Sequence, residues 1–290
     1  MEPIIFTHKA CLDHHTGPGH PERPERLRVV LEALRSFEQR EARAATLPEL
    51  ALCHSEAYIA LVKREIEAGN EELSTGDVRL SRGSWEAALR AAGAVLDGVD
   101  AAVGGRNSFC AVRPPGHHAE RGKGMGFCLF NNVAIGARYA QKKYGMKRIL
   151  IVDWDVHHGN GTEEIFAEDP SVFYFSTHQH PLYPGTGLAS NEHISNVPIS
   201  SKKGSRLKVL EAFSRLPELL QGFQPELTLI SAGFDAHSRD PLGGLDLEAA
   251  DFAALTDIVK PLAPKLVSVL EGGYDLIALA ESSLAHVEHL

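Results

Sequence analysis

A chain of 290 residues with 43% hydrophobic content can bury a large core, and its length favours one α/β domain over residues 1–290. The formal net charge of −9 disfavours nonspecific binding to nucleic acid, because no Lys/Arg stripe is available to displace counterions from phosphates. No apolar run approaches the roughly 20 residues that cross a bilayer. The N-terminus also lacks the basic region of a signal peptide, so we expect a cytoplasmic protein without a membrane partner.

Short apolar runs, each followed by loop residues and a helical pattern, recur along the chain and predict a parallel sheet covered on both faces. The predicted strands are 4–6, 108–112, 149–152, 172–175, 227–230 and 266–270. Helices are predicted at about 25–40, 55–68, 83–103, 131–144, 205–221, 247–262 and 275–288. Gly- and Pro-rich stretches at 13–24, 113–126, 178–200 and 232–246 are interpreted as loops at one end of the sheet.

The four cysteines are widely scattered and show no CxxC spacing. They are Cys11, Cys53, Cys110 and Cys128. This pattern argues against a disulfide framework and against a thiolate zinc site, so we expect reduced, packed thiols.

Polar motifs follow the ends of five predicted strands, in segments 113–118, 155–157, 176–178, 233–235 and 271–274. In open parallel sheets this edge is the ligand-binding side. Five strand ends that deliver polar groups to one rim indicate a functional site.

The segment that starts at Asp153 is the strongest metal-binding candidate. Asp153, Asp155 and His157 share one face of an extended chain, with successive members roughly 6.6 Å apart. All three would span about 13 Å, too far for one ion, so we take Asp155 and His157 as ligands and Asp153 as a supporting group. The Asp/His mixture suits zinc or another borderline transition metal better than magnesium or calcium. The alternative is a polar cluster that caps the next helix through Asn160 and Thr162.

Three further motifs carry candidate catalytic or metal-binding groups. Adjacent His117 and His118 follow a Pro-Pro-Gly bend, which lets both rings face one cavity, although two surface histidines are the alternative. Asp235 can supply the third metal bond, but the spacing does not exclude His237. Tyr274, after two glycines, can donate its hydroxyl to a developing oxyanion or can be merely structural.

The strings RPPGHHA, GFCLFNN, DWDVHHGNGT, PGTG, SAGFDAH and LEGGYD occur in this order over nearly the whole chain. Together they resemble the zinc-dependent histone deacetylase family, especially its class II and bacterial acetylpolyamine or acetoin-utilisation branch. The resemblance implies an arginase/deacetylase-like α/β fold, with a mostly parallel sheet of about eight strands and helices on both faces. It also implies removal of acetyl or a related acyl group from an amine such as acetyl-lysine, with release of acetate.

The resemblance assigns roles residue by residue. It makes Asp155, His157 and Asp235 the ligands of one catalytic Zn²⁺, which settles the choice between Asp235 and His237. It makes His118 the general base and then acid, His117 its electrostatic neighbour, Asp153 the carboxylate behind His117, and Tyr274 the oxyanion donor. Gly126 is the backbone acceptor for the substrate amide, and Phe127 and Tyr183 are opposite tunnel walls. Asp77 contacts the substrate backbone or amide, and Arg26 lines an acetate exit path.

Potassium binding is also implied by the resemblance. One K⁺ site corresponds to Asp153, Asp155, His157, Ser176 and Thr177, and a second lies near Phe166, Asp169 and Val172.

Two departures from class I members bear on mechanism and substrate. Asn160 stands where those proteins carry an aspartate, so His118 has a neutral partner and its pKa should be less elevated. The chain ends soon after Tyr274 without an appended domain, so we expect a small acetylated amine or a bacterial acetyl-lysine protein at least as much as a histone.

Three alternative functions remain to be weighed. An acetylpolyamine deacetylase is the nearest, although the sequence does not decide which of Asp13, Glu22, Asp77 or Glu120 reaches the rim. An arginase-like two-manganese ureohydrolase is disfavoured, because Asp235-Ala236-His237 lacks the second bridging carboxylate. A catalytically inactive acetyl-lysine reader is the non-enzymatic alternative, which the presence of all proposed catalytic residues disfavours.

Overall fold

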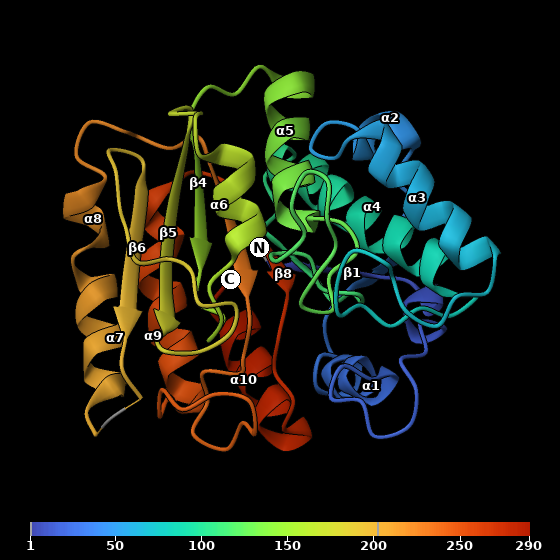
Figure 1. Ribbon diagram of the computed structural model, residues 1–290. Coiled ribbons are helices and arrows are strands. Elements are labelled where there is room, and N and C mark those ends of the chain that lie inside the picture. Colours follow the sequence, from blue (N-terminus) through green and yellow to red (C-terminus); the bar gives the residue numbers. More distant parts are fainter. Residues whose placement is uncertain (1, 202) are drawn as a thin grey trace.

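The computed structural model describes residues 2–201 and 203–290, which form one eight-stranded, all-parallel sheet flanked by helices (Figure 1). The strands are β1 (Ile4–Thr7), β2 (Gln39–Glu41), β3 (Ser108–Cys110), β4 (Ile149–Asp153), β5 (Val172–Gln179), β6 (Ile194–Ile199), β7 (Leu227–Ala232) and β8 (Leu266–Leu270). The helices are α1 (Pro24–Ala33), α2 (Leu47–Leu50), α3 (Glu56–Glu67), α4 (Ser84–Val103), α5 (Asn132–Tyr144), α6 (Asn160–Phe166), α7 (Ser205–Ser214), α8 (Leu216–Leu219), α9 (Ala249–Val259) and α10 (Leu276–Glu288). The expected α/β architecture is therefore confirmed.

The spatial strand order is β2-β1-β3-β8-β7-β4-β5-β6. The last strand in the sequence, β8, thus lies in the interior, paired with β3 on one side and β7 on the other. At the carboxyl end of the neighbouring strands, Asp153 of β4 is in register with Ser176 of β5 and Ser231 of β7. This register brings the polar residues that follow several strands to one edge.

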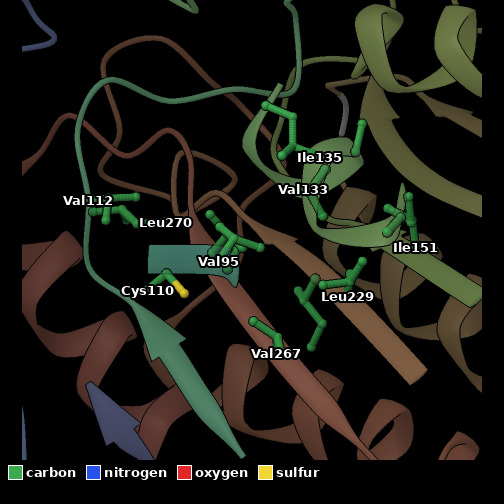
Figure 2. Close-up of a cluster of buried hydrophobic side chains, with 14 of the residues drawn as sticks. Val95, Cys110, Val112, Val133, Ile135, Ile151, Leu229, Val267 and Leu270 are labelled. Atoms are coloured by element: carbon green, nitrogen blue, oxygen red, sulfur yellow. The ribbon is translucent and has the colours of Figure 1, made fainter. Parts of the chain in front are cut away.

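The core is built from β-branched and aliphatic strand residues packed against small residues on helices. Figure 2 shows Val95 of α4, Ile135 of α5, Leu229 of β7 and Val267 of β8 as members of one hydrophobic cluster, all fully buried. The close approach of α4 to β3 depends on a glycine, because a Cβ at Gly98 of α4 would lie 2.8 Å from Ser108 Oγ of β3. On the other face, α10 packs on α9 and α1, and His286 of α10 contacts the sheet through Ser268.

Several predicted boundaries were wrong for identifiable reasons. The helix predicted at 25–40 ends at Ala33, and β2 occupies Gln39–Glu41. The helix predicted at 205–221 is two helices, because Pro217 lies in the first turn of α8 and cannot donate to a continuous helix. The stretch 178–200, interpreted as a loop, contains the edge strand β6, which tolerates Pro198 because an edge strand has a free side.

Two helices close to the site begin with side-chain caps. Asn131 accepts a hydrogen bond from the Ala134 N–H at the start of α5, and α5 ends at Gly145 with a left-handed φ of 69°. Asp275 accepts hydrogen bonds from the N–H groups of Ile277 and Ala278 at the start of α10. Since Asp275 follows Tyr274, this cap also fixes the chain direction after that tyrosine.

Candidate active site

A carboxylate, an imidazole and a second carboxylate converge beyond the ends of β4 and β7. One ligand atom from each of Asp155, His157 and Asp235 lies within 4.8 Å of the others, and this is the metal-capable cluster found among residues 2–201 and 203–290. His157 Nδ1 lies 3.0 Å from Asp155 Oδ1 and 3.2 Å from Asp235 Oδ2. Asp235 Oδ2 is buried, yet no group in the described chain donates a hydrogen bond to it. A buried carboxylate oxygen without a donor, aimed at an imidazole nitrogen, fits a metal cation.

The electrostatics of this cluster also fit a cation. Although burial opposes it, the hydrogen bond to Asp155 and the nearby Asp235 carboxylate raise the pKa of His157 to about 10. Burial and the nearby Asp155 carboxylate raise the pKa of Asp235 to about 7. Two buried carboxylates this close therefore favour a shared positive charge. Glycines leave room for them, because a Cβ at Gly233 would meet Asp155 Oδ2 at 2.1 Å and a Cβ at Gly272 would meet Asp235 Oδ2 at 2.0 Å.

Asp153 lies outside this cluster and supports a different residue. Its Oδ2 accepts hydrogen bonds from His117 Nδ1 at 3.0 Å and from the Tyr174 hydroxyl at 3.1 Å. Its Oδ1 accepts the backbone N–H of Asp155 at 3.1 Å. Asp153 thus lies behind His117, the position that the family resemblance implied, and outside the Asp155/His157/Asp235 cluster.

The two histidines that follow the Pro-Pro-Gly bend face the same cavity, with ring centroids 4.0 Å apart. His118 Nδ1 donates to Asn160 Oδ1 at 2.8 Å, so this histidine has an amide behind it where His117 has a carboxylate. The pKa of His117 lies well above its usual range, because the charges of Asp153 and Asp155 outweigh the opposing effect of burial. Burial and the neighbouring His117 and His157 hold the pKa of His118 well below its usual range.

A buried glutamate anchors the backbone of the histidine pair. Glu271 Oε2 accepts the N–H groups of Gly116 at 2.6 Å and His117 at 3.2 Å, and its Oε1 accepts from the Ser231 hydroxyl at 3.1 Å. Sequence reasoning placed Glu271 in a strand-end motif without giving it this contact. The only signal was its position, at the end of β8 and beside the glycines that precede Tyr274.

Tyr274 is held by groups on two other segments, those of Asp240 and Arg26. Its N–H donates to Asp240 Oδ2 at 2.6 Å, and the guanidinium of Arg26 lies 4.9 Å from its ring centroid. Arg26 donates to the backbone oxygens of Gly273 at 2.5 Å and Glu271 at 2.6 Å. Burial raises the pKa of the Tyr274 hydroxyl well above its usual range, so it remains a proton donor.

Behind Tyr274 lies a wholly buried ion cluster that sequence reasoning missed. Glu22 accepts hydrogen bonds from both Arg113 and Arg26, and all three side chains have 0% exposure. Although burial raises the pKa of Glu22, the Arg113 guanidinium lowers it to about 2. Arg113 thus ties the start of the loop that carries His117 and His118 to Glu22, which also holds Arg26.

A pocket of about 250 Å³ leads from the surface to His118, His157 and Tyr274. It is lined by Asp77, His118, Gly126, Phe127, His157, Leu182, Tyr183, Leu242 and Tyr274. The ring of Phe127 packs edge-on against His20, with centroids 4.7 Å apart, and against Tyr274 at 6.2 Å. Asp77 Oδ1 accepts hydrogen bonds from the Gly126 N–H at 2.7 Å and the Tyr183 hydroxyl at 3.3 Å.

Of the four acidic residues considered for the rim of the pocket, Asp13, Glu22, Asp77 and Glu120, the structure places one in the pocket lining. Asp77 is the carboxylate that lines the pocket. Glu22 is buried with its arginines, Glu120 bonds Asn160, and the backbone of Asp13 ends a 3-10 turn away from the pocket lining.

The residues expected to hold potassium are distributed around β5. Ser176 and Thr177 are buried, and Ser176 Oγ bonds His178 Nδ1 at 3.0 Å. At the second expected site, the Phe166 carbonyl accepts a hydrogen bond from His193, and Asp169 bonds Ser171 and Arg138. Protein groups therefore already contact Ser176 Oγ, the Phe166 carbonyl and the Asp169 carboxylate.

A parallel α/β fold with a metal-capable Asp-His-Asp cluster, a histidine pair and a tyrosine at one pocket defines a hydrolase of the arginase/deacetylase fold. The histone deacetylase domain family matches residues 20–290, and the chain belongs to this family. It is accordingly a deacetylase, an enzyme that hydrolyses acetyl-amide bonds.

The chain is similar to several known proteins. It is 43% identical to an uncharacterised protein of Synechocystis, covering 97% of both chains. It is 41% identical to the human polyamine deacetylase HDAC10, covering 93% of this chain but only 44% of that protein. A solved structure of the HDA15 HD domain superposes with a TM-score of 0.93 at 36% identity, covering 99% of this chain and 89% of that one. The chain thus spans the full length of a bacterial relative but less than half of the human one.

No helix in the described parts of the chain is both long enough and apolar enough to span a bilayer.

Proposed function

We propose that residues 1–290 form one catalytic domain, a zinc-dependent deacetylase that acts on the acetylated side chain of lysine in a protein or peptide. The observation that carries this proposal is the narrow pocket of about 250 Å³, which contains both His157 of the Asp-His-Asp cluster and the proposed acid–base and oxyanion groups. A slot lined by Phe127, Tyr183 and Leu182 suits an extended CH₂ chain that carries an amide at its tip.

The proposed ligands of zinc are Asp155, His157 and Asp235, three protein groups that leave a coordination position open. Bound zinc would polarise the acetyl carbonyl and lower the pKa of a water molecule. We further propose that potassium uses Asp153, Asp155, His157, Ser176 and Thr177, with a second site near Phe166, Asp169 and Val172.

In the proposed mechanism His118 receives the proton of the attacking water. Its depressed pKa keeps it neutral and able to act as a base, while His117, paired with Asp153, carries a positive charge beside it. The Tyr274 hydroxyl donates to the oxygen on which negative charge develops. His118 then returns its proton to the departing amine nitrogen, which breaks the C–N bond and leaves acetate and a free amine. Arg26, next to Tyr274 and behind it, is the proposed contact for departing acetate.

The pocket entrance favours a peptide over a polyamine. Asp77 is the carboxylate in the pocket lining, and its Oδ1 is already engaged by Gly126 and Tyr183. Leu182 and Leu242 add apolar side chains to the pocket lining, so a second ammonium group of a polyamine would meet a single shared carboxylate there. In the proposed binding mode the other oxygen of Asp77 accepts a backbone N–H of the peptide, and the Gly126 carbonyl accepts the N–H of the acetylated amine.

Deacetylation of a small acetylated amine is the second candidate. It is favoured by the similarity to animal proteins named polyamine deacetylase, which are 41% to 42% identical to this chain. The deciding experiment compares kcat/KM of the purified zinc enzyme on acetyl-lysine peptides, acetylputrescine, acetylspermidine and longer acyl-lysines. A higher kcat/KM for the peptides supports the first proposal, and a higher value for acetylspermidine replaces it with the second.

A further inference from the structure

A chain of hydrogen bonds leads from His118 through Asn160 to the carboxylate of Glu120, which has no role in the mechanism proposed above. His118 Nδ1 donates to Asn160 Oδ1 at 2.8 Å, and Asn160 Nδ2 donates to Glu120 Oε1 at 2.8 Å. Asn160 is 8% exposed, so water has little access to its amide. Within residues 2–201 and 203–290 the Glu120 carboxylate has Asn160 as its sole hydrogen-bond partner and forms no ion pair.

The backbone around Glu120 is fixed, so the carboxylate is held toward Asn160. Its N–H donates to the Lys123 carbonyl at 2.9 Å in a short antiparallel bridge. Its own carbonyl accepts a hydrogen bond from the buried His54 ring at 2.9 Å. Glu120 therefore reaches Asn160 from an anchored segment.

Glu120 decides which way the Asn160 amide points. An asparagine side chain can rotate by 180°, which exchanges its oxygen and its NH₂ group. The flipped orientation would place Asn160 Oδ1 against the Glu120 carboxylate, where two acceptors repel each other. The other neighbours of Asn160 Nδ2 are the His118 carbonyl at 3.5 Å and Met125 Sδ at 3.3 Å, and both are also acceptors.

The amide orientation in turn decides the tautomer of His118. With Asn160 Oδ1 facing it, His118 Nδ1 must carry the hydrogen, and Nε2 keeps its lone pair. With the amide flipped, the hydrogen would have to move to Nε2, which would then be unable to accept a proton from water. His117 needs no such arrangement, because Asp153, with oxygens only, can do nothing but accept from it.

We propose that Glu120 is a positioning residue for the reaction, which holds the Asn160 amide in the orientation that keeps His118 Nε2 available as the base. This inference rests on the proposed role of His118. Neither Asn160 nor Glu120 lines the pocket, so the effect of Glu120 is exerted through the imidazole of His118.

The first test uses kinetics of the zinc enzyme on an acetyl-lysine peptide. Glu120→Ala should lower kcat by about tenfold to a hundredfold, as loss of an outer hydrogen-bond partner commonly does, with little change in KM or in bound zinc. Glu120→Gln should lie between Glu120→Ala and the parent, because its amide oxygen can still accept from Asn160. The matched control is Glu164→Gln, a neighbouring exposed carboxylate that accepts the Arg121 N–H and has no link to His118. It should leave kcat unchanged.

A double-variant cycle separates positioning from folding. Aspartate at position 160 has only oxygens, so in Asn160→Asp it accepts from His118 Nδ1 in either orientation and the tautomer no longer depends on Glu120. The loss of kcat that Glu120→Ala causes in the parent should therefore largely disappear when Asn160→Asp/Glu120→Ala is compared with Asn160→Asp alone. An equal loss in both backgrounds would overturn the proposal.

A tautomer measurement does not depend on activity. A long-range ¹H–¹⁵N spectrum of the zinc-loaded enzyme, with the His118 signals assigned from a His118→Gln variant, should show the hydrogen on Nδ1 in the parent and a mixture of tautomers in Glu120→Ala. An unchanged tautomer together with an unchanged kcat would overturn the inference. If the parent enzyme hydrolyses none of the acylated substrates, the proposed function fails instead, and the spectrum still reports whether Glu120 controls the ring.

Discussion

His117 and His118 are adjacent in the chain and their rings lie 4.0 Å apart, yet their pKa values are displaced in opposite directions. Asp153 behind His117 stabilises an imidazolium there, and the amide of Asn160 behind His118 does not. Positive charge on the first ring then disfavours a proton on the second. Only one of the two histidines is thus prepared to accept a proton.

The asymmetry of the pair predicts the effect of removing the base. His118→Ala should lower kcat on an acetyl-lysine peptide by about 10²–10⁴-fold, which is the usual contribution of general acid–base catalysis. Bound zinc, measured by elemental analysis, should stay stoichiometric. A variant that retains parental kcat would move the base role to His117.

Loss of a proposed ligand should remove metal and activity together. Asp155→Ala or Asp235→Ala leaves only two of the three groups of the cluster, so zinc measured after dialysis should fall far below one ion per chain. His237→Gln is the control, because this residue shares the loop of Asp235 but lies outside the cluster. Stoichiometric zinc in the Asp155 or Asp235 variant would refute the ligand assignment.

Removal of a single hydroxyl tests the oxyanion donor. Tyr274→Phe keeps the ring that packs against Phe127 and under Arg26, so zinc content and substrate affinity should be unchanged. The kcat should fall by about 10²–10³, as it does when an oxyanion donor is lost. Steady-state kinetics that show parental kcat would make Tyr274 purely structural.

The pocket walls predict inhibition by a hydroxamate on a linear aliphatic stem. The stem would lie along Phe127 and Tyr183, so Phe127→Ala should weaken the inhibitor and raise KM for long-stem substrates more than for small acetylated amines. Isothermal titration on parent and variant measures the change. Equal affinities would show that the substrate does not approach along this pocket.

A buried histidine far from the pocket predicts part of the acid sensitivity. Burial lowers the pKa of His286 from 6.5 to about 3, while its ring bonds Thr256 and Ser268. Because the pKa of His286 is lower in the folded state than in the unfolded state, the unfolded protein takes up this proton first. The free energy of unfolding is therefore unaffected by His286 above about pH 6.5 and decreases as the pH falls from 6.5 toward 3. At pH 5 this one group should already have cost about 2 kcal/mol of unfolding free energy. Urea unfolding of His286→Gln should show a smaller decrease between pH 7 and pH 5 than the parent, and parallel curves would contradict the assignment.

The sequence was sufficient to predict the elements with strong periodicity. Each of the six short apolar runs forms a strand, and helices α3, α4, α5 and α10 lie within one or two residues of their predicted ranges. The edge strands β2 and β6 were missed because exposed residues such as Gln39 and Pro198 carry no alternating apolar pattern. Their formation depends on a neighbouring strand that presents free backbone groups.

The residues that the structure brings together at the candidate site were predictable from their types and spacing, and the residues that hold them in place were not. Asp155 and His157 stand out because their type and spacing suit a metal ligand. Glu22 and Glu271 act through partners 91 and about 155 positions away, and a single sequence contains no signal for such pairings. The role inferred for Glu120 likewise emerges only when its distance to Asn160 is known.

The interior position of β8 has a consequence for the order in which the protein is made. Strands β1, β2 and β3 form one block, β4 to β7 form another, and β8 alone pairs with both. The histidine pair follows the first block and the Asp-His-Asp cluster belongs to the second. Because β8 follows all the other strands of this sheet in the chain, the two blocks can be joined only after β8 has been made. When β8 inserts, Glu271 at its end bonds Gly116 and His117 on one side and Ser231 on the other, so the same step that completes the sheet fixes the histidine pair relative to the end of β7.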